Sequence, residues 1–132
     1  MNRMYLKAFV LFLTAGAMSL VWGHHGSRIS YDMTKTVTLT GIVKEFRYQN
    51  PHVYFTFDVT DEKGEVTTWG AETDSPIVME RRYQWNRHFL APGDKVTVTL
   101  WKSKVDAPRG FMAKLVRPDG GITDHSGQLP QE

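Results

Sequence analysis

Two adjacent histidines, His24 and His25, follow directly after an apolar segment that ends at Gly23. If the chain is cut after Gly23, His24 carries a free α-amine beside its own imidazole, and His25 adds a second imidazole. Three nitrogen donors at such short spacing suit Cu(II), which prefers tetragonal nitrogen ligation. The pair therefore predicts a copper site at the start of the mature chain.

Two other cleavage positions change what this pair can do. A cut after Trp22 makes His25 the third residue behind a free amine, an arrangement that also binds Cu(II) with backbone amide nitrogens. A cut after Ala17 leaves an ordinary histidine pair inside the mature chain. The competing interpretation is that both histidines are solvated residues that suit signal processing.

The tripeptide Asn50-Pro51-His52 is a second candidate site. Pro51 biases Asn50 towards an extended or turn conformation, and His52 then begins an alternating strand. In an OB barrel His52 would lie in the loop between the first two strands, on the usual binding face. We expect His52 to be a further copper ligand and Asn50 to lie in the binding loop. The alternatives are a turn histidine bonded to a neighbouring carbonyl and an asparagine that only forms the turn.

Four aromatic side chains lie on or near the strand faces opposite the main apolar positions: Tyr48, Tyr54, Trp69 and Trp101. As ligand-binding residues they would line a shallow exposed cleft and stack on a ring-bearing ligand such as a sugar or quinone. The alternative is that they complete the core at the barrel ends, with their polar tips reaching water.

None of the remaining titratable residues is predicted to be catalytic. Glu72 and Asp74 precede a predicted helix, where negative charge favours the helix dipole, and His125 lies in a polar C-terminal segment. The sequence has no nucleophile motif, zinc-protease helix motif or phosphate-cradling glycine loop. We therefore expect a protein that is not an enzyme.

The N-terminus has the pattern of an export signal. Arg3 and Lys7 form a basic region, and residues 8–22 form the apolar region. We expect a cleaved signal peptide over residues 1–23, a periplasmic or secreted protein, and no membrane span after cleavage. An uncleaved anchor is disfavoured because the apolar run is shorter than the roughly 20 residues that cross a membrane. The chain has no cysteine, so its core must supply stability without disulfides.

The charge balance argues against a nucleic-acid partner. The full chain has 16 Lys and Arg against 14 Asp and Glu, and the two basic residues Arg3 and Lys7 leave with the signal. Nucleic-acid binding needs a basic surface that survives processing. The expected partners are a metal ion, a small ligand or an envelope protein.

The elements that must position these residues are mostly strands. Alternating apolar residues predict strands over residues 36–49, 52–60, 66–72, 95–102 and 111–117. The first of these changes phase beside Gly41, which predicts a bulge or a sharp bend. Asp74 or Ser75 suits a helix cap and Pro76 suits the first helical position, so a short helix should follow the third strand.

This order predicts an all-β fold, a small five-stranded OB-like barrel with one short helix between strands 3 and 4. A plain β-sandwich is the alternative, because periodicity alone does not establish closure. The expected organisation is a signal peptide (1–23), an N-terminal arm (24–35), an OB-like β-barrel domain (36–119) and a flexible polar tail (120–132).

Several motifs of the chain occur together in one order: "HHGS" at residues 24–27, "VTLTGIVKEFRYQNPHVYFTFDV" at 37–59, Trp69, Ser75-Pro76 and "LAPGDKVTV" at 90–98. In this the chain resembles a family of small exported bacterial proteins, domain of unknown function 6152. It departs from the family pattern at "RRYQW" (81–85), where a glycine is expected ahead of Trp85. The resemblance implies an envelope location and a compact β fold, and it brings no known substrate.

Together these observations predict a small periplasmic binding module that binds copper through His24, His25 and His52. Copper binding should weaken as imidazole and amine donors protonate at lower pH. The alternative is a metal-free envelope module that binds a small ligand or a protein with its loop face and aromatic residues, without a cofactor.

Overall fold

The computed structural model describes residues 30–127, and the following elements refer to that part of the chain. The strands are β1 (Tyr31–Arg47), β2 (Tyr54–Thr60), β3 (Val66–Glu72), β4 (Lys95–Ser103), β5 (Arg109–Val116) and β6 (Ile122–Asp124). Helix α2 (Pro76–Tyr83) lies between β3 and β4. The predicted signal peptide and the pair His24–His25 lie outside the described residues.

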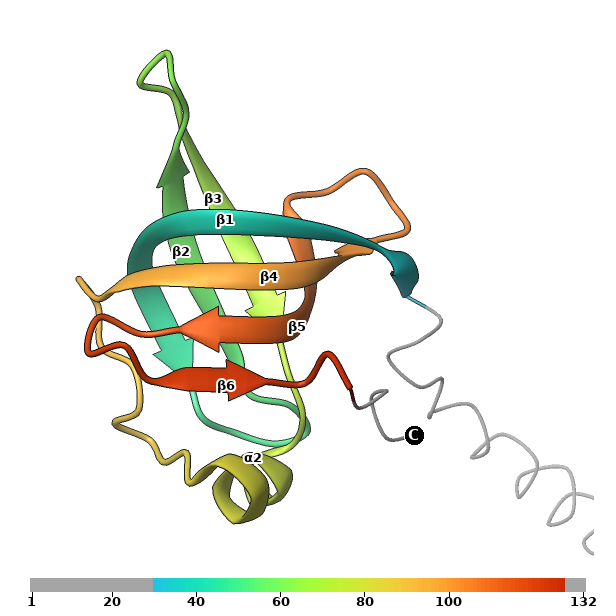
Figure 1. Ribbon diagram of the computed structural model, residues 1–132, viewed down its shortest axis with the longest axis vertical. Coiled ribbons are helices and arrows are strands. Elements are labelled where there is room, and N and C mark those ends of the chain that lie inside the picture. Colours follow the sequence, from blue (N-terminus) through green and yellow to red (C-terminus); the bar gives the residue numbers. More distant parts are fainter. Residues whose placement is uncertain (1–29, 128–132) are drawn as a thin grey trace, which may run out of the picture.

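Five strands close into a barrel (Figure 1). β1 pairs antiparallel with both β2 and β4, β2 pairs with β3, and β4 pairs with β5. The ring closes where β3 runs parallel to β5, with Gly70 opposite Arg109 and Glu72 opposite Phe111. A closed five-stranded barrel with a helix between its third and fourth strands is an OB-like fold. The predicted fold class is confirmed, and the β3–β5 pairing excludes an open sandwich.

β1 curves around the barrel because it changes partners along its length. Its first part pairs with β4 as far as Ile42, and its last part pairs with β2 from Ile42 onward. Gly41 lies at this change and touches the neighbouring strand, since a Cβ there would be 2.5 Å from the carbonyl oxygen of Asp58. The bend predicted beside Gly41 therefore follows from close backbone approach.

A bulge in β1 follows shortly after this bend. The register with β2 shifts between Val43 and Glu45, so Lys44 is the extra residue. Val43 is buried and Phe46 packs against the core, while Lys44 and Glu45 both face solvent. The bulge thus explains why the apolar residues of β1 change phase.

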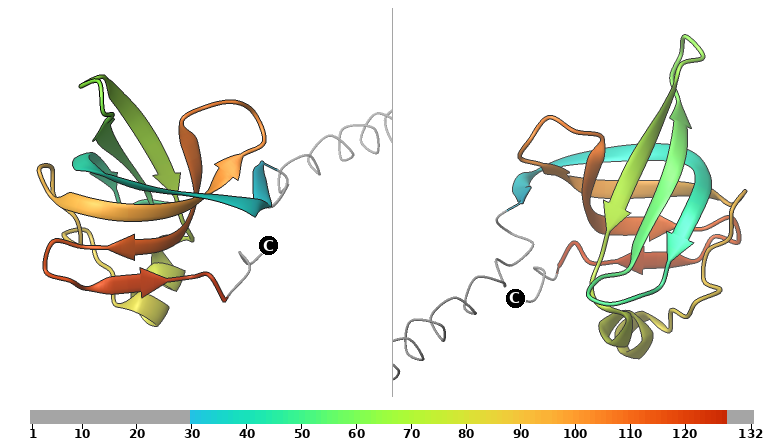
Figure 2. Two further views of the ribbon diagram at one scale, coloured as in Figure 1. Left: turned by 45° about the horizontal axis from the view of Figure 1, so that its top comes forward. Right: turned by 180° about the vertical axis from the view of Figure 1, so that it is seen from behind.

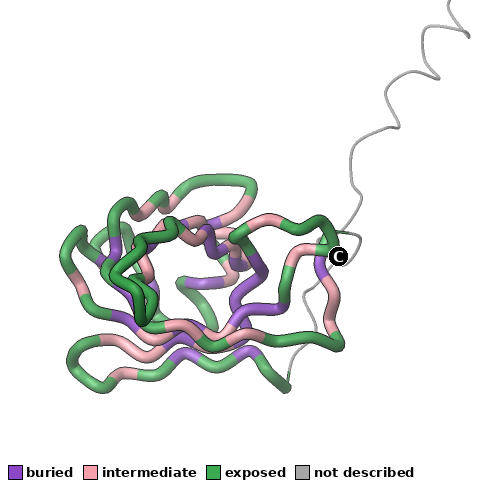
Figure 3. Tube along the Cα trace, turned by 90° about the horizontal axis from the view of Figure 1, so that it is seen from above, coloured by how far each residue is buried: buried purple, intermediate pink, exposed green. Residues whose placement is uncertain are grey.

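The main core fills the barrel. Figure 3 shows short buried stretches alternating with half-buried and exposed ones along the trace. Its largest fully buried side chains are Trp85, Phe55, Phe57, Met79, Leu100, Met112, Leu115, Val43, Val53, Val96 and Val98. Burial of this apolar area supplies the stability of a chain that has no disulfide.

Helix α2 covers one end of the barrel, and the β2–β3 hairpin projects from the other (Figure 2). The helix begins as predicted, with Ser75 as N-cap in an extended conformation and Pro76 in the first turn. It ends at Gln84 in a left-handed conformation, and Met79 is its buried residue. Within residues 30–127, no helix is long and apolar enough to cross a membrane.

Two predicted boundaries differ from the structure. β1 begins at Tyr31, inside the expected N-terminal arm, and Tyr31 is buried. The expected flexible tail contains β6, which pairs antiparallel with β5. Trp85 Nε1 donates to Thr123 Oγ1 at 3.0 Å, and His125 is only 2% exposed. The prediction of a flexible tail is wrong for residues 122–125, because these contacts hold the segment on the barrel.

Candidate functional site

His52 lies where the β1–β2 loop meets the end of β3. Val53 N donates to the carbonyl of Asp74 at 3.0 Å, and Thr73 N donates to the carbonyl of Val53 at 2.9 Å. These two backbone hydrogen bonds hold the loop against the residues that follow β3. As a result, the side chain of His52 lies beside that of Glu72.

A chain of hydrogen bonds joins His52 to Glu72 and Glu72 to Tyr31. His52 Nδ1 is 2.5 Å from Glu72 Oε1, and the Tyr31 hydroxyl donates to Glu72 Oε2 at 2.5 Å. Burial of Tyr31, helped by the neighbouring carboxylate, raises the pKa of its hydroxyl. Tyr31 therefore stays protonated and continues to donate to Glu72. We call these three residues the His52–Glu72–Tyr31 chain.

The carboxylate determines which nitrogen of His52 is free. A carboxylate at Nδ1 favours the tautomer that carries its hydrogen there, which leaves the lone pair on Nε2. Within residues 30–127, Glu72 is the hydrogen-bond partner of His52, and the His52 side chain is 40% exposed. Metal-binding histidines are commonly oriented by a carboxylate in this way.

A metal ion would need further ligands. Within the described part of the chain, no group of three His, Cys, Asp or Glu residues could hold a metal ion. Of the three predicted copper ligands, only His52 lies within residues 30–127. The other two, His24 and His25, lie outside the described residues. His25 precedes Tyr31 by six residues, a segment that spans at most about 20 Å when extended.

His125 is a second histidine with defined surroundings, and it is buried. Its ring stacks on Tyr83 with 4.3 Å between the centroids, and its Nδ1 lies 3.6 Å from Asp74 Oδ2. Burial lowers the pKa of His125 to about 4 and raises the pKa of the Asp74 carboxyl. His125 is therefore neutral near pH 7 and packs as part of the fold. Among residues 30–127, its buried Nε2 has no hydrogen-bond partner.

The predicted aromatic residues lie in different surroundings. Trp101 is 6% exposed and packs with Tyr31 and Phe111, so the prediction that it lines an exposed cleft is wrong. The start of β1, which was predicted to belong to the N-terminal arm, covers the face of β4 that carries Trp101. Tyr48 is half-buried, and its hydroxyl lies 2.8 Å from the carbonyl of Pro76, to which it donates. Tyr48, directly after β1, is thereby joined to α2.

The other predicted ligand-binding residues lie on β2, β3 and the loop before β2. Trp69 is half-buried and packs against the core. The hydroxyl of Tyr54 lies over Gly70, where any Cβ would overlap it. Asn50 is exposed and precedes Pro51 through a cis peptide bond. The ligand-binding role of these residues stays a prediction.

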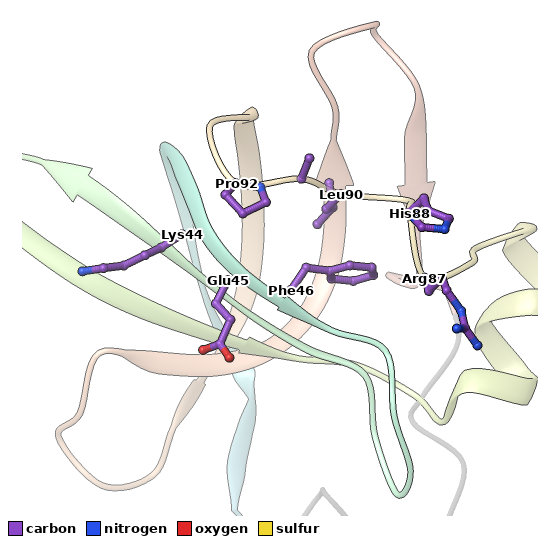
Figure 4. Close-up of a pocket in the computed structure, with 8 residues that line it drawn as sticks. Lys44, Glu45, Phe46, Arg87, His88, Leu90 and Pro92 are labelled. Carbon is purple, nitrogen blue, oxygen red and sulfur yellow. The ribbon is translucent and has the colours of Figure 1, made fainter.

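A cavity of about 380 Å³ lies elsewhere on the barrel, between β1 and the segment that leads into β4 (Figure 4). Its lining residues are Lys44, Glu45, Phe46, Arg87, His88, Leu90, Ala91 and Pro92. The cavity shares no residue with the His52–Glu72–Tyr31 chain, so substitutions can probe the cavity and this chain independently.

A family model described as a family of unknown function, DUF6152, matches residues 12–112. The chain belongs to this family. The part matched to DUF6152 includes β1 to β4, the beginning of β5 and all of the His52–Glu72–Tyr31 chain. The resemblance inferred from the sequence motifs is confirmed.

No curated protein matches this DUF6152 chain. Among solved structures, it is similar to Rim1, a mitochondrial single-stranded DNA-binding protein of S. cerevisiae. The TM-score is 0.46 and the sequence identity 11%, over 66% of this chain and 96% of that one. A likeness this distant does not indicate a shared ligand.

Proposed function

We propose that this DUF6152 protein is a small periplasmic binding module that holds copper through His52 together with His24 and His25. The observation that carries the proposal is the hydrogen bond between His52 Nδ1 and Glu72 Oε1. This bond orients the imidazole ring of His52 and leaves its Nε2 available to a metal ion. In known metal sites, a carboxylate that does not touch the metal often orients a ligating histidine in the same way.

The position of Tyr31 supports the participation of the N-terminal histidines. Tyr31 begins β1 and is bonded to Glu72, which is bonded to His52. The six residues from His25 to Tyr31 reach about 20 Å when extended, which is enough to bring His25 back over His52. The length of this segment is therefore compatible with a site that includes both His25 and His52.

The donor set favours copper among the common divalent ions. Imidazoles and a terminal amine are nitrogen donors, and Cu(II) binds such donors most tightly in the first-row series. A cut after Gly23 would make the amine of His24 available as well. In this proposal the protein carries or buffers the ion.

The first test is native mass spectrometry of the untagged protein exported by its host, which gives the mature N-terminus and any bound copper. Copper affinity is then measured by competition with a chelator, in the mature protein and in His52→Ala. We expect His52→Ala to weaken binding by about tenfold or more, and the control His88→Ala to leave it unchanged. One added residue before His24 should also weaken binding.

Either of two results would contradict this proposal. One is a mature chain that takes up no copper, and the other is an affinity that His52→Ala leaves unchanged. The metal-free alternative, with a small ligand or an envelope protein as partner, would then be favoured.

A further inference from the structure

The cavity beside Phe46 has an apolar wall, which is formed by Phe46, Leu90, Ala91 and Pro92. Figure 4 shows the Phe46 ring directed from β1 towards the segment that carries Leu90 and His88. Trp85 lies against Phe46, with 6.1 Å between the ring centroids. Because Trp85 is fully buried, the Phe46 ring is supported from within the core.

Backbone hydrogen bonds hold the two sides of this cavity together. Val43 N donates to the carbonyl of Asp94, and Gly93 N donates to the carbonyl of Val43, both at 2.8 Å. The Asp94 carboxylate also accepts from Ala91 N at 2.9 Å. The wall is therefore formed before any ligand arrives, which lowers the entropic cost of binding.

The charges on the β1 side of the cavity are already paired. The β1 bulge turns Lys44 and Glu45 outward, and Glu45 receives two hydrogen bonds from Arg47 at 2.7 and 2.8 Å. Lys44 Nζ lies 3.5 Å from Asp58 Oδ2, and its side chain extends away from the other lining residues (Figure 4). Because both charges already have partners, we do not expect Lys44 or Glu45 to be the main contact of a bound ligand.

The opposite rim carries basic side chains that lack such partners. Arg87 and His88 are exposed, and within residues 30–127 neither side chain forms an ion pair or hydrogen bond. Asn86 fixes the turn that carries them, because its side-chain oxygen accepts from His88 N at 2.8 Å. Figure 4 shows the Arg87 side chain directed towards α2 and away from Pro92, so it must change rotamer to meet a ligand that lies against Phe46.

We propose that this cavity binds a small carboxylic acid whose body is aromatic or aliphatic. The Arg87 guanidinium would take the carboxylate, since its planar fork matches two carboxylate oxygens. The body would lie against Phe46 and Pro92. A volume of about 380 Å³ is near the lower end of ligand pockets, which fits a molecule of about one ring.

The test is a titration of the isotope-labelled mature protein, without copper, followed by the backbone amide signals. Benzoate is the probe, benzyl alcohol presents the same ring without charge, and acetate presents the charge without the ring. We expect benzoate to shift the amides of residues 44–46 and 87–91 and to bind about fivefold or more tightly than either comparison compound.

Arg87→Gln should remove the advantage of benzoate over benzyl alcohol. Arg81→Gln, which changes an exposed arginine of α2, is the matched control and should retain it. His52→Ala should leave benzoate binding unchanged, so the test does not depend on the copper proposal.

Three results would overturn the proposed acid site. They are benzoate shifts scattered over the surface, equal affinity for benzoate and benzyl alcohol, and an Arg87→Gln variant that binds benzoate as well as the wild type.

Discussion

His52 Nδ1 and Glu72 Oε1 lie 2.5 Å apart although 20 residues separate them in the sequence. Tyr31 donates to the other oxygen of the same carboxylate. Glu72 thus joins the beginning of β1, the β1–β2 loop and the end of β3. A carboxylate shared by three parts of the chain can orient a metal ligand and also stabilise the fold, and these two effects are separable by mutation.

Glu72→Gln should weaken copper binding by about 10- to 100-fold, because the amide no longer fixes the His52 tautomer as a carboxylate does. The measurement is chelator competition on the mature protein. Glu65→Gln, at the exposed tip of the β2–β3 hairpin, is the matched control and should bind copper like the wild type. If Glu72→Gln kept full affinity, Glu72 would have no part in orienting a ligand.

Tyr31→Phe should lower the free energy of unfolding by about 1–3 kcal/mol, because a half-buried carboxylate loses a hydrogen-bond donor. Urea denaturation measures this loss. Tyr54→Phe is the control, since the Tyr54 hydroxyl makes no hydrogen bond within residues 30–127. Equal losses in the two variants would mean that the bond to Glu72 contributes nothing specific.

The strand order and the helix start could be predicted because they depend on local patterns. Alternation predicted five of the strands, and Pro76 after Ser75 predicted the first turn of α2. The barrel also follows from this order, because the OB-like arrangement places the helix between the third and fourth strands. β6 was missed, since three residues are too few to give a periodic signal.

The site was only half predictable. His52 stood out by its residue type and its place after Pro51, whereas Glu72 was explained by the helix dipole alone. The register of the β2–β3 hairpin could have placed Glu72 near His52. The turn pairs Thr60 with Val66, and counting back along both strands puts Tyr54 opposite Glu72. Tyr31 had no local signal, because its bond to Glu72 exists only after the barrel closes.

Stability should fall as the pH is lowered from about 6.5 to about 4, because of His125. Burial lowers the pKa of this histidine from its ordinary 6.5 to about 4, so between these values the unfolded chain binds the proton and the folded chain does not. Protonation therefore favours unfolding in this window, by up to roughly 3 kcal/mol for a shift of this size. Urea denaturation at pH 7, 5 and 4 measures the change.

His125→Phe should flatten this pH dependence while keeping the stacking on Tyr83. It should also be no less stable at pH 7, because it removes a buried Nε2 that has no hydrogen-bond partner among residues 30–127. The raised pKa of Asp74 acts in the opposite direction, since its folded form binds the proton more readily. A His125→Phe variant as acid-sensitive as the wild type would show that another group causes the loss.

Gly41→Ala should destabilise the barrel by about 1–3 kcal/mol, the usual cost of forcing extra atoms into a filled space. The new methyl would lie 2.5 Å from the carbonyl oxygen of Asp58 and 2.9 Å from the Phe57 ring. Phe57 can shift only within the core, and the carbonyl belongs to a paired strand, so β1 must move away from β2. Gly127→Ala is the control and should change the urea midpoint little, because a Cβ there would have no atom of the described residues within 4 Å. An equally small effect at both positions would mean that β1 bends without needing this close approach.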